Sequence, residues 1–401
     1  MNIRRSLLCL RRLLFLLPSL FALTCAAQQT PAPRALDLTS NDGTKLKATF
    51  FAASKPGPGV ILFHQCNRQR KVWDDLAEHL AASGINVLTL DFRGFGESSG
   101  TPIDQLPAAQ VQEIFDEKLP LDADTGYRYL VTQPGVNAKL IGAGGASCGV
   151  NQSVQLARRH PEVIALVLLS EGTNVSGREF LRKKPDMPLF MAAADDDPDP
   201  GVVEYMQWIF SFSSNLANQF EHYKTGGHGV EMFAAHPELP GQIVTWLGSQ
   251  LSSSRSASTA AKSPMTVAPE DKFLDSLDQP GAAANAAKLY AEQHQRNPDA
   301  VLFSEVLMNR LGYEHLQTGD NKGAIELFKL NVLVFPRSPN VYDSLSDAYL
   351  ADGQKDLARQ NAQKALDLLP TNTTYPDAFR KGLQESAEKK LKQLSPTSAN
   401  P

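Results

Sequence analysis

The stretch AKLIGAGGASCGVNQSVQLARR, residues 138–159, decides the fold. It opens on an apolar strand pattern, continues through a glycine-rich segment, and ends with helical spacing from Gln152. Gly145 and Gly149 stand two residues before and two residues after Ser147. A serine in a strained turn between strand and helix needs glycine at both places, because a side chain would collide with neighbouring backbone. The stretch therefore predicts a nucleophilic serine, and the alternative is a glycine-rich helix start without chemistry.

Strand and helix patterns alternate on both sides of this turn. A hairpin is expected over residues 35–51, where the pattern alternates around Asn41-Asp42-Gly43. Continuous apolar runs predict buried strands over residues 60–63, 85–90, 138–141, 163–169 and 187–192. Such strands between helices imply an α/β domain over residues 35–250, with a mostly parallel, doubly wound sheet covered on both faces. The chemistry of such sheets lies beyond the carboxyl ends of the strands.

Two candidate partners of Ser147 come later in the chain. Asp197 follows the predicted strand at 187–192, and His228 lies among glycines in TGGHG, residues 225–229. A carboxylate that orients a histidine, which in turn takes a proton from a serine, is an arrangement used for acyl transfer. A solvated acidic turn or an adventitious calcium loop is the alternative for the aspartates here. The rival acids are Asp195, Asp196 and Glu171.

Residues 58–250 resemble the α/β-hydrolase superfamily, and most nearly the dienelactone hydrolases and related serine esterases without a large lid. The resemblance rests on VILFH at 60–64, LDFRGFGES at 90–98, the Ser147 turn and His228. In the family, the loop that corresponds to residues 91–98 shapes the site without doing the chemistry.

The resemblance assigns a role to each candidate residue. The nucleophile, the base and the acid would be Ser147, His228 and Asp197. The oxyanion hole would be formed by backbone N–H groups of Cys148 and of Gln65 or Cys66.

The chain departs from the family pattern at three places. HQCN at 64–67 stands where the family has His-Gly, Val150 stands where a second glycine often follows, and alanines occupy 192–194 before the acid. These departures concern the oxyanion loop and the choice of acid more than the nucleophile. Dienelactone hydrolases use a cysteine nucleophile, but Cys148 lacks glycines at the two flanking positions, so Ser147 is preferred.

Cys66 and Cys148 are the cysteines expected to remain after processing. If both loops fold as in the family, both residues lie at the oxyanion hole. Either they form a disulfide that clamps the oxyanion hole, or they remain unpaired and pack as small apolar side chains. The unpaired alternative is favoured, because a disulfide requires Cα atoms within about 7 Å.

Residues 1–27 are predicted to be a signal peptide. Four arginines precede the uncharged run at 13–27, which is too short for a stable membrane span and is interrupted by Pro18. The alternatives are a transmembrane anchor and, with cleavage, lipid attachment at Cys25. The protein is therefore expected to be exported, periplasmic or secreted.

The C-terminal third has a different pattern. Residues 251–270 are predicted to be a flexible linker, and residues 271–395 an all-α domain. Small and apolar residues recur after 34 positions over 305–372, and the matching pairs are Leu311 and Leu345, Gly319 and Gly353, Ala324 and Ala358, and Pro336 and Pro370. The pattern resembles two tetratricopeptide repeats with a capping helix at 377–394. A helical bundle with coincidental spacing is the alternative.

Two hypotheses for the function follow. The first is an exported serine hydrolase that acts through an acyl-enzyme intermediate. Esters are its favoured substrates, and peptides are the second choice. The short segment between Leu169 and Met187 leaves no room for a large lid, which favours an open site for small-molecule or acylated substrates. The second is a catalytically inactive, hydrolase-like protein that binds a protein partner or a second copy through its repeats.

Composition excludes several other classes. The chain has 401 residues and a net charge of −4, which creates no field to attract nucleic acid. Its histidines have no metal-binding spacing, so no metal and no cofactor are expected.

Overall fold

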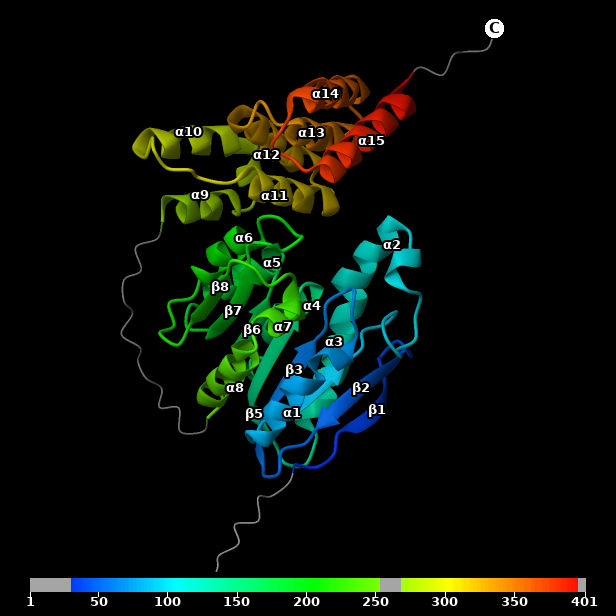
Figure 1. Cartoon of the computed structure of the whole chain (residues 1–401), viewed down its shortest axis with the longest axis vertical. Coiled ribbons are helices and arrows are strands. Elements are labelled where there is room, and N and C mark those ends of the chain that lie inside the picture. Colours follow the sequence, from blue (N-terminus) through cyan, green and yellow to red (C-terminus); the bar gives the residue numbers. More distant parts are fainter. Residues whose placement is uncertain (1–29, 253–267, 396–401) are drawn as a thin grey trace, which may run out of the picture.

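The computed structural model describes residues 30–252 and 268–395. The predicted signal peptide at 1–27 and most of the predicted linker at 251–270 lie outside these residues. The described chain forms an α/β domain and an all-helical domain that lies against one end of it (Figure 1). None of the helices in these two ranges is long and apolar enough to cross a membrane.

In the α/β domain, eight strands form one sheet in the order β1-β2-β4-β3-β5-β6-β7-β8. β2 pairs antiparallel with both β1 and β4, and the remaining neighbours pair parallel. The strands are β1 (Arg34–Thr39), β2 (Lys45–Phe51), β3 (Gly57–Phe63), β4 (Asn86–Leu90), β5 (Val136–Ala146), β6 (Val163–Leu169), β7 (Leu189–Ala194) and β8 (Gln219–Tyr223). The predicted mostly parallel α/β sheet is confirmed.

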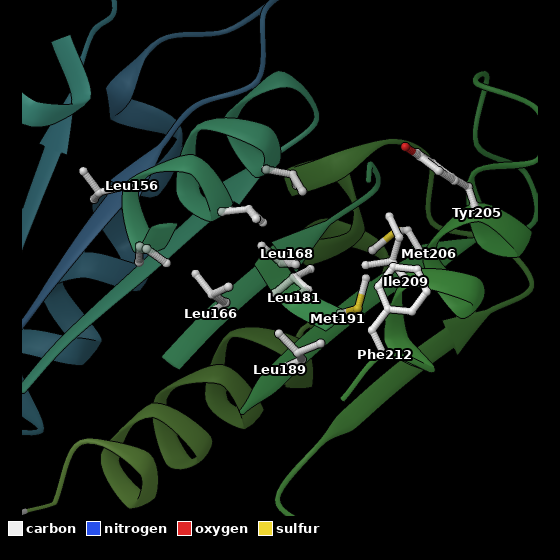
Figure 2. Packing of buried hydrophobic residues seen from close by; sticks show 14 of the residues in the cluster. Leu156, Leu166, Leu168, Leu181, Leu189, Met191, Tyr205, Met206, Ile209 and Phe212 are labelled. Carbon is white, nitrogen blue, oxygen red and sulfur yellow. The ribbon is translucent and has the colours of Figure 1, made fainter. Parts of the chain in front are cut away.

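Helices cover both faces of this sheet. They are α1 (Asp74–Ala82), α2 (Ala108–Glu113), α3 (Leu119–Val131), α4 (Cys148–Arg159), α5 (Val175–Lys183), α6 (Val202–Phe210), α7 (Met232–Ala235) and α8 (Glu238–Gln250). α1 and α8 share one apolar core with the sheet, and α3 to α6 share the other. In Figure 2, Leu168 of β6 lies beside Leu181 of α5, and Met191 of β7 lies beside Ile209 of α6. Burial on both faces explains why the strands are continuously apolar.

β5 is longer than the strand expected at 138–141, because its glycines remain in the sheet. Gly144 lies between Leu62 of β3 and Val167 of β6. A Cβ atom on Gly144 would lie 2.9 Å from a methyl carbon of Leu62, so the close packing itself requires glycine. The strand therefore continues to Ala146, the residue before Ser147, and α4 begins at Cys148, the residue after it.

The chain between β6 and β7 contains α5 and no large lid, as predicted. The loops at this edge are nevertheless contacted by the helical domain. Its helices are α9 (Pro269–Leu277), α10 (Ala286–Arg296), α11 (Glu305–Gln317), α12 (Asn321–Val334), α13 (Pro339–Ala351), α14 (Lys355–Leu368) and α15 (Asp377–Leu394).

α11 with α12 and α13 with α14 form consecutive packed pairs whose starts lie 34 residues apart, at Glu305 and Pro339. The predicted all-α region is confirmed, and its assignment to tetratricopeptide repeats stays a prediction. Within the first pair, Gly312 of α11 lies against the buried ring of Phe328 in α12. A small residue is required at this crossing, because the two helices meet there.

Gly312→Ala is expected to destabilise the protein by about 1–3 kcal/mol, because overpacking forces a buried side chain to move. The added Cβ atom would lie 2.4 Å from a ring carbon of Phe328. The measurement is the free energy of unfolding from urea titration. The matched control is Gly382→Ala in α15, where the new Cβ atom meets nothing within 4 Å. This control is expected to stabilise by up to about 1 kcal/mol through helix propensity, and equal effects of the two changes would contradict the packing argument.

Candidate active site

Ser147 occupies a strained turn between β5 and α4. Its backbone has φ 51° and ψ −128°, a conformation that residues other than glycine rarely adopt. A Cβ atom on Gly145 would lie 2.1 Å from the Gly149 carbonyl oxygen, and one on Gly149 would lie 2.4 Å from the Phe63 carbonyl oxygen. The two flanking glycines are therefore required by the backbone, for the reason that the sequence pattern suggested.

Asp197 and His228 form a hydrogen-bonded pair at the ends of β7 and β8. The Nδ1 atom of His228 lies 2.8 and 2.9 Å from the two carboxylate oxygens of Asp197. The side chain of Asp197 is 1% exposed and that of His228 is 15% exposed. The hydrogen bond to this carboxylate raises the pKa of His228 above its ordinary value, although burial opposes the change. The imidazole is thus oriented and its protonated form is stabilised.

The rival acids have other partners. Asp195 contacts His222 at 2.5 Å and Lys224 at 2.7 Å. Asp196 accepts a hydrogen bond from the Gly227 N–H at 2.9 Å, and Glu171 pairs with an arginine of the helical domain. Of the four candidate acids, the structure brings Asp197 to His228.

The loop of His228 packs directly against the Ser147 turn. A Cβ atom on Gly229 would lie 3.2 Å from the Cβ atom of Ala146, so the residues next to His228 and Ser147 lie close together. The Ser147 hydroxyl makes no hydrogen bond within the described residues.

A disulfide joins Cys66 to Cys148, with 5.8 Å between their Cα atoms. The expectation of two unpaired cysteines is therefore wrong. β3 and β5 are neighbours in which Phe63 pairs with Gly145, and each cysteine lies at the same offset beyond these paired residues. The disulfide ties the loop after β3 to the first residue of α4, where the backbone N–H has no partner in the helix by position. Of the candidate oxyanion donors, Cys66 and Cys148 form this disulfide and Gln65 lies next to it in the chain.

Gln65 connects the same loop to the loop of His228. Its side-chain oxygen accepts the Val230 N–H at 3.1 Å, and its amide nitrogen donates to Asn67 at 2.9 Å. Since both ends of the side chain are bonded, Gln65 holds the loop after β3 through its side chain and leaves its backbone as the candidate donor.

His64 is a structural histidine. Its Nδ1 atom donates to the Gln65 carbonyl at 2.8 Å, and its Nε2 atom accepts the Phe92 N–H at 3.1 Å. Burial lowers the pKa of His64, so this imidazole is neutral. Phe92 belongs to the loop after β4, in which Arg93 pairs with the buried Asp122 at 2.6 Å. His64 thus links two loops at this edge of the sheet.

One residue near the site had no counterpart in the sequence patterns. Arg310 of α11 donates to Glu171 at 2.9 Å and also pairs with Asp199, two residues after Asp197. In the sequence Arg310 is one of several polar residues on an amphipathic helix, and no local signal distinguishes it. Among the described residues, no group of histidine, cysteine, aspartate or glutamate side chains could hold a metal ion.

Residues 54–193 match the family model described as serine aminopeptidase, S33. The match runs from just before β3 into β7 and contains Ser147. With the sheet order and the strand-turn-helix around Ser147, it decides the class of the domain. The domain has the α/β-hydrolase fold. Asp197 and His228 lie beyond the matched range, in the part of this α/β-hydrolase domain that follows it.

The hydrolase domain is also similar to individual proteins. The thiohydrolase aneE of Aspergillus aculeatus is 31% identical over 182 residues, which cover 42% of this chain and 54% of that protein. The polyketide transferase grgF of Penicillium sp is 28% identical over 185 residues, 45% of this chain and 60% of that protein. The chain thus spans little more than half the length of these curated relatives. A solved structure of the esterase Pf2001 of Pyrococcus furiosus has 19% identity and a TM-score of 0.42, and covers 55% of this chain and 94% of the esterase.

Asp197→Asn is expected to lower the pKa of His228. The substitution removes the carboxylate charge that stabilises the imidazolium, while burial, which lowers this pKa, remains. The measurement is an NMR titration of the His228 ring carbons. Asp196→Asn is the matched control and is expected to leave the pKa of His228 unchanged. The opposite result, with Asp196 controlling the titration, would reject Asp197 as the partner.

A peptide map of the purified protein under non-reducing conditions is expected to contain the peptides of Cys66 and Cys148 as one linked species. The loops carrying these residues are adjacent, so the bond forms without backbone movement. The control is the same digest after reduction, in which the two peptides separate. Recovery of both cysteines as alkylated free thiols before reduction would contradict the disulfide.

Proposed function

We propose that the protein is a serine hydrolase that cleaves an ester or related acyl bond through an acyl-enzyme intermediate. The observation that carries the proposal is the buried Asp197 bonded to His228, in a loop packed against the strained turn of Ser147. A serine, a histidine and an acid on three neighbouring loops are the parts that acyl transfer requires.

In the first half of the reaction, the Ser147 oxygen attacks the acyl carbon while His228 Nε2 takes the hydroxyl proton. The carbonyl π electrons move to oxygen, and the resulting oxyanion accepts hydrogen bonds from the Cys148 N–H and from the N–H of Gln65 or Cys66. When the intermediate collapses, the bond to the leaving group breaks and His228 returns the proton to that group. The acyl group then remains on Ser147.

In the second half, a water molecule gives a proton to His228 and attacks the acyl carbon. The second oxyanion collapses, Ser147 recovers its proton from His228, and the acid is released. Asp197 keeps its charge throughout and stabilises the imidazolium in both halves. Because the base must be neutral to act, activity is expected to fall as the pH drops through the raised pKa of His228.

The substrate class is proposed from chemistry and similarity together. A relative is named a thiohydrolase, which supports an acyl bond to sulfur or oxygen as the scissile bond. The matched family model is described as an aminopeptidase, which keeps peptides as the second class. Small-molecule esters and thioesters are therefore the first substrates to test.

Export and partner binding are part of the same proposal. The basic and then uncharged start of the sequence supports a signal peptide, and a disulfide persists best in an oxidising compartment. We therefore propose that the protein acts in the periplasm or outside the cell. The 34-residue offset between the helix pairs supports a tetratricopeptide-like surface for a protein partner or a second copy.

Treatment of the purified protein with a fluorophosphonate is expected to add one phosphonyl group, because an activated serine displaces fluoride from this reagent. The measurement is intact mass, followed by mapping of the adduct to Ser147. The matched control is Ser147→Ala, which removes one oxygen atom and is expected to gain no adduct.

A folded wild-type protein that gains no adduct would overturn the acyl-enzyme proposal. Such a result would favour a binding role for the hydrolase-like domain and the helical domain. An adduct that persists in Ser147→Ala would show that another residue is the nucleophile, and the triad of Ser147, Asp197 and His228 would then be wrong.

A further inference from the structure

The helical domain is joined to the hydrolase domain by a continuous core and by buried ion pairs. Phe273 of α9 and Leu307 of α11 belong to the same apolar cluster as α5 and α6. At the centre of the contact, Arg178 of α5 is 1% exposed and pairs with Asp278 at 2.7 Å and with Glu314 at 2.8 Å. An unpaired buried guanidinium would be costly, so these contacts hold the two domains in one arrangement (Figure 1).

α11 contacts the loop that carries the candidate acid. At the start of the helix, the Ser304 N–H donates to Glu204 of α6 at 3.0 Å. Two residues further, Val306 lies against Gly201, where an added Cβ atom would lie 3.0 Å from a methyl carbon of Val306. Arg310 then pairs with Asp199. The segment from Asp199 to Glu204 is therefore held along its length by the helical domain.

The contact of Arg310 continues to the candidate triad. Asp199 uses its carboxylate for Arg310 and its backbone N–H for Asp197 Oδ1, at 2.8 Å. Asp197 in turn accepts the hydrogen bond from His228. The second nitrogen of Arg310 donates to Glu171, which follows β6. One guanidinium thus joins the loops after β6 and β7, and three successive hydrogen bonds connect it to His228.

We propose that Arg310 is a positioning residue of the active site: it holds the loop of Asp197 through Asp199, so that the helical domain is a necessary part of the catalytic apparatus. The inference rests on the proposed function and extends it. It gives the C-terminal domain a role in catalysis that is independent of any partner the domain binds.

The charge of Arg310 also acts on His228. Glu171 and Asp199 both raise the pKa of His228, and Arg310 neutralises both carboxylates. Burial raises the pKa of Glu171 and Arg310 lowers it, so Glu171 depends on this cation for its charge. Removing the cation is therefore expected to raise the pKa of His228 through the uncompensated charge of Asp199, and removing the charge of Asp199 is expected to lower it. The charged groups that act on His228 directly are Asp197, Glu171 and Asp199, and Glu231 accepts its backbone N–H. Each cation acts through a carboxylate, since Arg310 pairs with Glu171 and Asp199, and Arg68 pairs with Glu231 at 2.8 Å.

Arg182 provides a matched control within the same interface. Arg182 lies in α5 and, like Arg310, binds two carboxylates across the interface between the domains. Its partners are Asp275 at 2.8 Å and Asp278 at 2.5 Å. These partners belong to α9 and its end, and not to the loops of the candidate triad. A loss of docking alone would therefore affect Arg310→Gln and Arg182→Gln alike.

The experiment measures the rate of fluorophosphonate labelling of the purified protein as a function of pH, together with the melting temperature. Arg310→Gln is expected to slow labelling about 10-fold or more, because small displacements of a catalytic group have large effects on rate. The midpoint of the acidic limb is expected to move to higher pH. Arg182→Gln is expected to keep the wild-type midpoint and a labelling rate within about 2-fold, as for a residue that does not position the triad.

Two further variants keep the test decisive if Arg310→Gln folds poorly. Asp199→Asn, at a partly exposed position, is expected to slow labelling as well but to move the midpoint to lower pH. Arg310→Lys retains the charge and is expected to restore the midpoint while recovering only part of the rate, because one ammonium cannot reproduce the two-sided contact.

Wild-type labelling rates and midpoints in Arg310→Gln and Asp199→Asn would overturn the inference, with labelling of the wild type itself intact. Equal losses in Arg310→Gln and Arg182→Gln would also overturn it, because docking alone would then explain the effect. Failure to label the wild type would instead reject the proposed function. In that case an NMR titration decides the inference, and an unchanged pKa of His228 in Arg310→Gln would reject it.

Discussion

The structure depends on the close approach of backbone at the Ser147 turn. The carbonyl of Phe63 at the end of β3 and the first turn of α4 occupy the space that side chains on Gly145 and Gly149 would need. This packing holds Ser147 in a backbone conformation that costs free energy in isolation and persists because the surrounding sheet and helix determine it. The loops after β3, β7 and β8 are arranged around this turn, and the candidate site exists where they meet.

Each loop at this edge is held by a different kind of contact. The disulfide between Cys66 and Cys148 holds the loop after β3 against the start of α4. The Gln65 side chain connects that loop to the backbone beyond His228, and the buried Asp197 orients the imidazole. Preorganised donors and an oriented base are effective in acyl transfer because they need no rearrangement when charge develops. Rigidity at the candidate site is thus supplied by its neighbours.

The helical domain belongs to the same structural unit. Apolar residues of α9 and α11 extend one face of the hydrolase core. At this contact the buried Arg178 pairs with Asp278 at the end of α9 and with Glu314 of α11. Such a contact resembles a domain core more than a transient interface. In a chain without a large insertion between β6 and β7, the helices that contact the loops at this edge come from beyond residue 268, and they bring Arg310 next to the candidate acid.

The sequence by itself determined the sheet, the Ser147 turn and the set from which the partners of Ser147 come. These features are encoded locally, because strand periodicity and flanking glycines depend on residues close together in the chain. The family resemblance named Asp197 as the acid, but only the tertiary structure separates it from Asp195 and Asp196, because that choice depends on how β7 and β8 place their loops. The tertiary structure also decided that Cys66 and Cys148 pair and that Arg310 reaches the acid loop. These contacts join residues far apart in the chain, so no local pattern records them, and only packing brings them within bonding distance.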